Sequence, residues 1–310
     1  MTPRLVYLGL DVAKATLAGH WAGKHFSLPN TAAGHRALLT RIHAGPEPVQ
    51  VICEATGGYE RGLVAALHQA GQPVSVLHPT RARQLASGLG YVAKNDTLDA
   101  EALARIGTVL TPAPTPAPPE GVALLAALVT RRDQLAELIR REKQHRETTT
   151  EAVLRRDLDQ SLAALQKRLE KCEALIRQHL LAHPPLAQKA ARLQEAPGVG
   201  FVGAVTLLGM LPELGVGSAA RITSLAGLAP RDHDSGAFRG ARHVHGGRPK
   251  IRRILYLCAL SAVRHHPQLK AFYQRLRLAG KPPKVALTAA ARKLLTYLHS
   301  ALKNPLFQLA

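Results

Sequence analysis

The sequence predicts an α/β domain followed by a mostly α-helical remainder. Three observations lead to this fold class: short apolar runs alternate with helical patterns up to residue 110, five prolines crowd residues 111–119, and apolar residues recur at helical spacing from residue 121 onward. A length of 310 residues suits two or three domains. We therefore expect an α/β domain at 1–110, a linker at 111–120, a helical coiled-coil region at 121–194 and a C-terminal domain at 195–310.

Four apolar runs in the first segment read as strands. Residues 5–10 lead into Asp11, and a second run covers residues 24–28. Residues 49–53 form a short continuous apolar run before Glu54, which is typical of a strand buried on both faces. A fourth strand is expected at 73–77, where a proline at the start is tolerated.

Helices are expected between these strands. One runs from Thr31, which can cap it, through residue 42, and another covers residues 59–69 and ends before Gly71. A third covers residues 96–106. It begins with Asp96 and Asp99, where the helix dipole favours carboxylates.

The helical region follows a stiff linker, TPAPTPAPP, whose prolines forbid a helix. Beyond it, apolar residues step alternately by four and three, as in a coiled-coil seam. The seam is narrow with charged flanks, which favours a coiled coil between chains; the alternative is an antiparallel pair within one chain. The seam is Leu158, Leu162, Leu165, Leu169, Cys172 and Ile176, and a looser upstream stripe is Leu124, Leu128, Leu135 and Leu138.

The charge of the chain is concentrated near its end. The net charge is +20, and residues 196–310 hold 17 Lys and Arg against 3 Asp and Glu. Such a segment would repel itself without a polyanion, so nucleic acid is the expected partner. A membrane span is not expected, because no apolar run approaches ~20 residues, and the start does not resemble a signal peptide. A membrane surface is the weaker alternative, because aromatics are only 4% of the chain and no long amphipathic helix carries bulky aromatics opposite a basic face. Three scattered cysteines favour a reducing, intracellular setting.

Four carboxylates are the first candidate site. Asp11 and Glu54 each end an apolar run, and Asp96 and Asp99 share one helix face by their spacing. Strand-end acids lie where α/β sheets bind ligands, and converging carboxylates can hold two divalent ions for phosphodiester chemistry. The alternatives are a turn residue at Asp11, an N-cap at Asp96 and a surface acid at Glu54.

A serine in an arginine-rich stretch, RDHDSGAFRGAR, is the second candidate. Ser235 lies between Arg231 and Arg239, with Arg242 beyond, and arginines can hold a scissile phosphate. From local sequence alone, an ordinary Ser-Gly turn is the favoured interpretation. Of the competing serines, Ser218 is expected to cap a helix and Ser224 to be structural.

Two further features favour phosphate contacts. Gly198 and Gly200 lie in a turn before an apolar helix, whose first N–H groups can hold a phosphate as in a helix-hairpin-helix; an ordinary turn is the alternative. Downstream of Pro249, basic residues oppose the helix dipole unless an anion is bound. They are Lys250, Arg252 and Arg253.

The histidines are not expected to bind structural zinc. They include an H-x-H at His243 and His245 and a pair at His265 and His266. A structural zinc site needs four convergent ligands, so we expect these side chains to face phosphate, partly protonated.

The motifs together resemble one family. GLDVAK, CEATGGYE and AKNDTLDAEALA resemble the three blocks of the DEDD transposases of the insertion-sequence "one-ten" family, and residues 224–276 resemble its second domain. The resemblance covers essentially the whole chain and extends to pilin-gene invertases. It implies a ribonuclease-H-like (RuvC-like) first domain. It further implies that the four acids bind Mg²⁺, with Mn²⁺ as the alternative ion, and that Lys94 contacts nucleic acid.

The resemblance also reverses the interpretation of Ser235. This residue matches the serine that attacks DNA in the family and forms a phosphoserine intermediate. The implied function is a transposase acting on donor and target DNA, guided by a bridge RNA, as a dimer or tetramer at the bacterial nucleoid. One departure is the stretch HGGRPK at residues 245–250, where the family often has Gly-Asn.

Three other functions compete. A RuvC-like nuclease or junction resolvase would hydrolyse DNA with the four acids and need no serine. An ATPase of the actin and sugar-kinase type would need glycines and small hydroxyl residues after Asp11, which GLDVAK lacks. A DNA-binding protein without activity would not need the acids.

Overall fold

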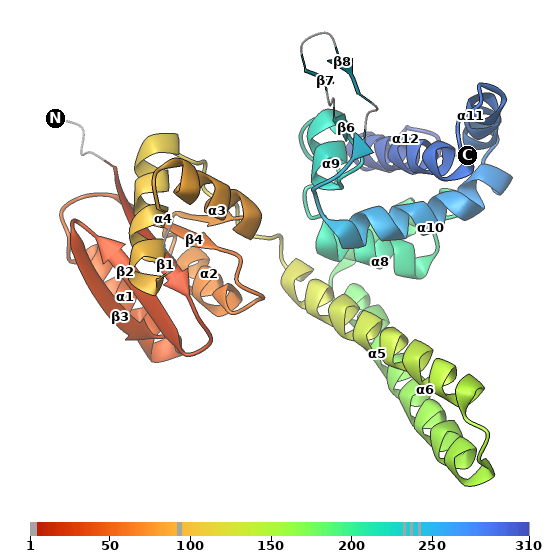
Figure 1. Cartoon of the computed structure of the whole chain (residues 1–310), viewed down its shortest axis with the longest axis horizontal. Helices are drawn as coiled ribbons and strands as arrows, with labels where there is room; N and C mark the ends of the chain where they lie inside the picture. The colour runs from red at the N-terminus through yellow and green to blue at the C-terminus, as the bar shows by residue number, and fades with distance from the viewer. Residues whose placement is uncertain (1–4, 92–94, 232–233, 236–237, 241–242, 310) are drawn as a thin grey trace. The chain divides into compact units, whose positions relative to one another are not determined.

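The computed structural model describes residues 5–91, 95–231, 234–235, 238–240 and 243–309. The chain divides into two compact units, Met1–Ala117 and Pro118–Ala310, and the division falls inside the proline-rich segment (Figure 1). Within the described ranges, no helix is long and apolar enough to cross a membrane.

The first unit is built on a mixed sheet of five strands in the order β3-β2-β1-β4-β5. β1 pairs antiparallel with β2 and parallel with β4, so the sheet changes from antiparallel to parallel at its centre. All four predicted strands are present. The strands are β1 (Val6–Val12), β2 (Thr16–Trp21), β3 (Lys24–Pro29), β4 (Val49–Glu54) and β5 (Val74–Leu77).

Helices cover both faces of this sheet (Figure 1). Leu8 and Leu10 of β1 join a buried cluster with residues of α1 and α2, whereas Ile52 of β4 packs with residues of α3 and α4. Thr31 caps α1 as expected, since its side chain accepts from the Gly34 N–H. The helices are α1 (Ala32–His43), α2 (Glu60–Gln69), α3 (Pro79–Gly88) and α4 (Asp96–Leu110).

Two elements of the first unit were not predicted, the strand β2 and the helix α3. β2 carries Ala18, Gly19 and His20, which have weak strand propensity, and it forms because it pairs on both sides. Ala22 and Gly23 both have positive φ, which closes a tight hairpin between β2 and β3. α3 has little apolar periodicity and buries only Ala82 among its residues.

The second unit is mostly helical, as predicted. Its single large core joins residues from α5 through α12, and Arg248 before α10 makes a bidentate ion pair with Glu213 at 2.6 Å for both contacts. The helices are α5 (Val122–Thr148), α6 (Ala152–Leu181), α7 (Pro184–Gln194), α8 (Phe201–Met210), α9 (Ala219–Leu225), α10 (Pro249–His265), α11 (Pro267–Leu278) and α12 (Pro283–Lys303).

The predicted seam of α6 packs against α5 of the same chain (Figure 1). Leu162, Cys172 and Ile176 are buried, and Arg132 of α5 pairs with Glu173 of α6 at 3.0 Å. The structure thus realises the antiparallel alternative within one chain, and a coiled coil between chains stays a prediction.

The upstream stripe was placed wrongly at two positions. Leu124 and Leu138 are 54% and 42% exposed, whereas the neighbouring Leu125 and Ile139 are buried. A repeat of 3.6 residues drifts against a strict heptad, and the packed face of α5 follows the helix period.

A short β-ribbon between α9 and α10 was also not predicted. It consists of two antiparallel pairs, β6 with β9 and β7 with β8, and it extends from the helices of this unit (Figure 1). Its strands are β6 (Pro230–Arg231), β7 (Asp234–Ser235), β8 (Phe238–Arg239) and β9 (His243–Val244).

Candidate active site

Sheet pairing places two of the predicted acids next to each other. Leu10 of β1 lies opposite Cys53 of β4 in a parallel pair, so Asp11 and Glu54 follow at the carboxyl ends of adjacent strands. In open α/β sheets this end of parallel strands is where ligands bind.

Helix α4 supplies the other two acids. Asn95 caps the helix through a hydrogen bond from the Thr97 N–H, at 3.0 Å, and Asp96 and Asp99 lie in the first turn. The cap is therefore Asn95 and not Asp96. The capped first turn holds both carboxylates at one end of α4.

A glycine lets α4 lie close to the sheet. A Cβ atom at Gly9 of β1 would come within 2.0 Å of the Ala100 carbonyl oxygen and 2.5 Å of the Ala104 nitrogen. Only a residue without a side chain fits at this contact. Because Gly9 precedes Asp11 by two residues, the same contact brings α4 over the end of β1.

All four predicted acids line one cleft of about 510 Å³. Thr56 from the loop after β4 and Arg83 and Ser87 of α3 line it as well. The sequence prediction missed Arg83, because no motif marked α3; its guanidinium is a suitable phosphate ligand.

The three neighbouring acids affect the titration of Asp11. Burial is the largest cause that raises the pKa of Asp11, followed by the charges of Asp96, Asp99 and Glu54, and together they bring this pKa to about 6. Like charges held together disfavour ionisation, and a bound cation would relieve the repulsion. Four carboxylates offer the hard oxygen ligands that Mg²⁺ prefers, so these residues fit a divalent ion.

Loops beside the cleft are held by groups that sequence reasoning did not single out. The buried Glu60 carboxylate accepts hydrogen bonds from the N–H groups of Thr56 at 3.0 Å and Gly58 at 2.9 Å. The Asn30 amide donates to the carbonyls of Ala13 at 2.9 Å and Tyr59 at 3.2 Å, which joins the loops after β1 and β4. Glu60 lies within the CEATGGYE block, which was its only signal.

Ser235 lies in the second unit, in strand β7 opposite Phe238 of β8. The backbones of Arg231 and Arg239 lie in β6 and β8 of the same ribbon. The predicted contacts Lys94 and Arg242 lie outside the described residues. The four acids and the serine therefore belong to different units of the chain.

The base of the ribbon, Gly227 on one side and Gly246 and Gly247 on the other, is tightly packed and contacts the start of α10. A Cβ atom at Gly247 would lie 2.2 Å from the Gly227 nitrogen, and Arg252 donates to the Gly246 carbonyl at 2.7 Å. Burial acts to raise the pKa of Glu213, but the hydrogen bonds and charge of Arg248 outweigh it and hold that pKa below its ordinary value. These contacts fix where the ribbon leaves the helices.

The three basic residues at the start of α10 differ in their contacts. Lys250 pairs with Asp133 of α5 at 2.8 Å, and Arg252 bonds to backbone carbonyls, so both have protein partners without an anion. Arg253 is exposed and has no ion-pair partner among the residues that the structure describes. Arg253 is thus the most available of the three for a phosphate.

Gly198 and Gly200 have different surroundings. Gly198 has a φ of +93°, and a Cβ atom there would lie 2.6 Å from the Ala262 nitrogen of α10. Gly200 is exposed, caps α8, and has open space where a Cβ atom would be. Close packing accounts for Gly198, and a phosphate contact at either glycine stays a prediction.

Ser218 caps a helix, whereas His266 lies in the core of the second unit. Ser218 caps α9 as expected, and its side chain accepts from the Arg221 N–H. The prediction for His266 was wrong: its ring is 2% exposed, stacks on Tyr297 at 5.6 Å between centroids, and has a pKa lowered by burial. His266 therefore belongs to the core and does not face phosphate.

Known proteins and protein families match this chain over nearly its whole length. One family model, described as "Transposase" and built on DEDD transposases of the IS110 type, matches residues 8–172, and a second, "Transposase IS116/IS110/IS902 family", matches residues 190–274. A pilin gene-inverting protein of Moraxella bovis is 27% identical over 96% of each chain. An uncharacterized 43.6 kDa protein of insertion element IS110 from Streptomyces coelicolor is 32% identical over 48% of this chain and 36% of its own.

Proposed function

The chain belongs to the IS110 family of transposases, and from this premise we propose that it cuts and rejoins DNA with four carboxylates and one serine. It is an enzyme that rearranges DNA. We further propose a ribonuclease-H-like (RuvC-like) first unit. The mixed sheet with acids at the ends of β1 and β4 supports this fold.

The four acids are proposed to hold Mg²⁺ at the end of the sheet. Asp11 and Glu54 would bind from adjacent strand ends, and Asp96 and Asp99 from the first turn of α4. When bound, the ion activates an attacking oxygen and stabilises a leaving one. Arg83, at the same cleft, is suited to hold a phosphate oxygen and orient the strand.

Ser235 is proposed as the nucleophile. Its Oγ loses its proton and forms an ester bond to the phosphorus, while the bond from phosphorus to the leaving sugar oxygen breaks and that oxygen takes up a proton. Attack on this ester by a hydroxyl of a second DNA strand reforms a phosphodiester and releases the serine. No external energy source is needed, because one ester replaces another at each step.

The observation that carries the proposal is that all four predicted acids line one cleft. They come from two strands and one helix, and burial together with their charges raises the pKa of Asp11. Acids that served only as turn residues, caps or surface charges would have no reason to gather.

The experiment is a recombination assay in cells between reporter plasmids that carry the element's ends and its target. We expect Asp11→Asn and Ser235→Ala each to abolish recombination, whereas Ser224→Ala, a serine of α9 in the same unit, should retain it. Recombination by Ser235→Ala at the wild-type level would refute the serine mechanism. Recombination by Asp11→Asn would refute the metal site.

A hydrolytic RuvC-like nuclease is the second candidate. It is favoured by one observation, that all four acids gather inside the first unit without Ser235. This function predicts nicked DNA with free ends from Ser235→Ala. The primary proposal predicts no nicking by this variant.

Nucleic-acid guidance and assembly are proposed on the family resemblance. The 17 Lys and Arg against 3 acids in residues 196–310 support a polyanionic partner, and we propose a bridge RNA and DNA together. We also propose a dimer or tetramer. Sequencing RNA that co-purifies with the protein should recover one discrete species encoded beside the gene, and random fragments would contradict the guided mechanism.

A further inference from the structure

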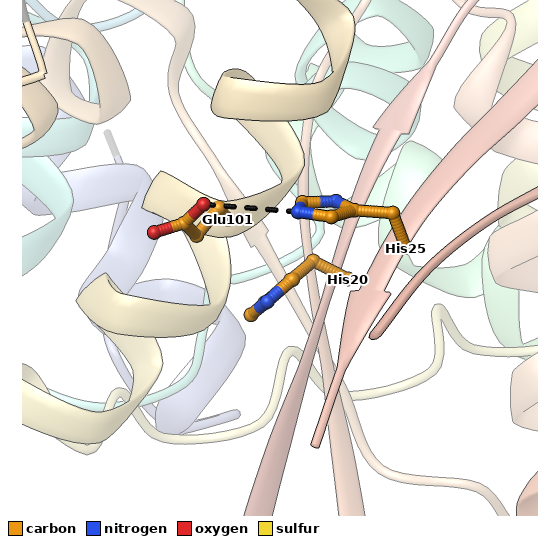
Figure 2. A group of neighbouring side chains, drawn as sticks. All are labelled: His20, His25 and Glu101. Atoms are coloured by element: carbon orange, nitrogen blue, oxygen red, sulfur yellow. Dashed lines mark ion pairs between the residues drawn. The ribbon is translucent and has the colours of Figure 1, made fainter. Parts of the chain in front are cut away.

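A second group of ligand-type side chains lies on the first unit, apart from the four acids. His20 of β2 and His25 of β3 face each other across the antiparallel pair, and Glu101 of α4 lies beside them (Figure 2). His20 is also opposite Gly9 of β1, the residue against which α4 packs. These side chains are therefore brought together by the register of three strands and by the contact of α4 with Gly9.

The three side chains are close enough to share one ion. One ligand atom from each lies within 4.8 Å of the other two, and the His25 Nε2 is 3.8 Å from a Glu101 carboxylate oxygen. The two imidazole centroids are 4.5 Å apart. Ligands around a tetrahedral ion with bonds of ~2.0–2.2 Å lie about 3.4 Å from one another, so small side-chain rotations would complete the geometry.

One of these groups lacks a partner in the protein. The Nδ1 atom of His20 is buried and has no hydrogen-bond partner among the described residues. Buried polar atoms without partners are uncommon and costly, and a bound ion is one of their ordinary explanations. Burial, followed by the nearby His25, lowers the pKa of His20, which favours the neutral imidazole that binds metals.

Glu101 is held in a suitable orientation. The Tyr91 hydroxyl donates to one Glu101 carboxylate oxygen at 3.0 Å, while the other oxygen faces His25. A hydrogen bond of this type from outside the ligand set fixes the direction of a metal-binding carboxylate. The exposed fractions of the His25 and Glu101 side chains, 41% and 38%, leave room for an ion to enter and for water to complete its coordination.

We propose that His20, His25 and Glu101 form a binding site for a divalent transition-metal ion such as Zn²⁺. Two imidazoles and one carboxylate suit Zn²⁺ better than Mg²⁺, which prefers oxygen ligands alone. The ion would join the β2–β3 hairpin to α4, two residues beyond Asp99. Its role is to fix the helix that carries Asp96 and Asp99, so these histidines are positioning residues and do not contact DNA.

The test uses the untagged full chain, freed of metal by a chelator and titrated with Co²⁺ as a spectroscopic probe. We expect one equivalent to give the visible absorption of tetrahedral Co²⁺, and Zn²⁺ to displace it. His25→Gln and Glu101→Gln should each weaken binding at least ~10-fold, because loss of an outer-shell partner alone costs this much. Zn²⁺ should also raise the melting temperature of the wild type and not of these variants.

Three control variants distinguish this site from Co²⁺ binding elsewhere on the protein. His43→Gln changes an exposed histidine of α1, and Asp11→Asn changes the acidic cleft. Both variants should keep the tetrahedral Co²⁺ absorption of the wild type, because neither residue belongs to this site. Tyr91→Phe should weaken binding less than the ligand variants do. Octahedral Co²⁺ absorption, or equal affinity in His25→Gln and wild type, would overturn the proposal. Because His25 is exposed on its strand, this variant stays informative even if His20→Gln does not fold.

Discussion

The acidic cleft and the Ser235 ribbon are built in different ways. The cleft is made by buried strands and by a helix that packs against Gly9 at backbone contact distance, so four carboxylates are held by the core of the first unit. The ribbon has two pairs of two-residue strands, and Arg252 of α10 donates to the Gly246 carbonyl where the ribbon ends. A short two-stranded ribbon is marginal by itself, so its geometry depends on what it contacts.

This difference suggests a division of roles. A metal site needs ligands fixed to fractions of an ångström, which packed elements provide. A nucleophile that must reach a DNA phosphate can be delivered by a segment whose final position is set on binding. Predictions that affect one region without the other test this division.

The largest effect is expected at the contact between β1 and α4. Gly9→Ala would place a methyl group against the Ala100 carbonyl and push α4 away from the sheet. We expect a loss of ~1–3 kcal/mol in the free energy of unfolding. Recombination should fall at least about 100-fold, because displacement of catalytic groups by about 1 Å has this effect. Chemical denaturation and the cellular recombination assay measure the two quantities.

Gly88→Ala is the matched control for this substitution. Gly88 ends α3, and no atom lies within 4 Å of the position of its Cβ. The substitution should leave stability and recombination unchanged or slightly raise stability. Equal losses in both variants would contradict the role given to close packing at Gly9.

The second effect concerns the base of the ribbon. Arg248→Lys removes the bidentate geometry of the pair with Glu213, whose side chains are only 38% and 27% exposed. We expect the free energy of unfolding of the second unit to fall by about 1–2 kcal/mol, and the pH dependence of the acidic cleft to stay unchanged. Arg140→Lys breaks an exposed pair with Glu137 and should have no measurable effect on stability.

The third effect is a pH dependence that arises from Asp11. Its pKa is about 6 in the folded protein against an ordinary value of 3.8, so the folded state binds this proton more tightly than the unfolded state. Without metal, the charged carboxylate destabilises the fold above pH 6, and this penalty disappears as pH falls from about 6 to 3.8.

The measurement is the difference in thermal stability between wild type and Asp11→Asn across pH. On acidification, the free energy of unfolding of the metal-free wild type should rise relative to that of the variant by on the order of 1 kcal/mol, after allowance for solvent screening. Saturating Mg²⁺ should reduce this gain, because the bound ion favours ionised carboxylates. A flat difference curve without metal would contradict the gathering of the acids.

The smallest effect is a difference between the basic residues of α10 in how they contribute to the salt dependence of DNA binding. Arg253→Gln should lower the slope of log affinity for DNA against log salt by about 1, because this exposed cation is free to contact a phosphate. Lys250→Gln should change the slope less, since Lys250 is paired with Asp133. A larger change in slope for Lys250→Gln than for Arg253→Gln would mean that DNA binding breaks the ion pair between Lys250 and Asp133.

The sequence predicted the four acids because their positions depend on local patterns. Asp11 and Glu54 end apolar strands, and the spacing of Asp96 and Asp99 already places both on one helix face. β2 was missed because Ala, Gly and His give no strand signal, and only pairing with its two neighbours makes it a strand.

Groupings that depend on the fold could not be predicted. His20, His25 and Glu101 come from three elements, with no spacing motif, and only the sheet register and the Gly9 contact bring them together. Likewise, the periodicity of residues 158–176 identifies a packed seam, but it cannot say whether the partner helix belongs to the same chain.

The identity of the residue that becomes joined to DNA tests the central claim most directly. DNA with a modified phosphate that stalls rejoining would be incubated with the protein and Mg²⁺, and the DNA-linked peptide identified by mass spectrometry. We predict one adduct, on Ser235, which is absent in Asp11→Asn although DNA binding persists. Cleaved DNA with free ends and no linked peptide, produced equally by Ser235→Ala, would contradict the account.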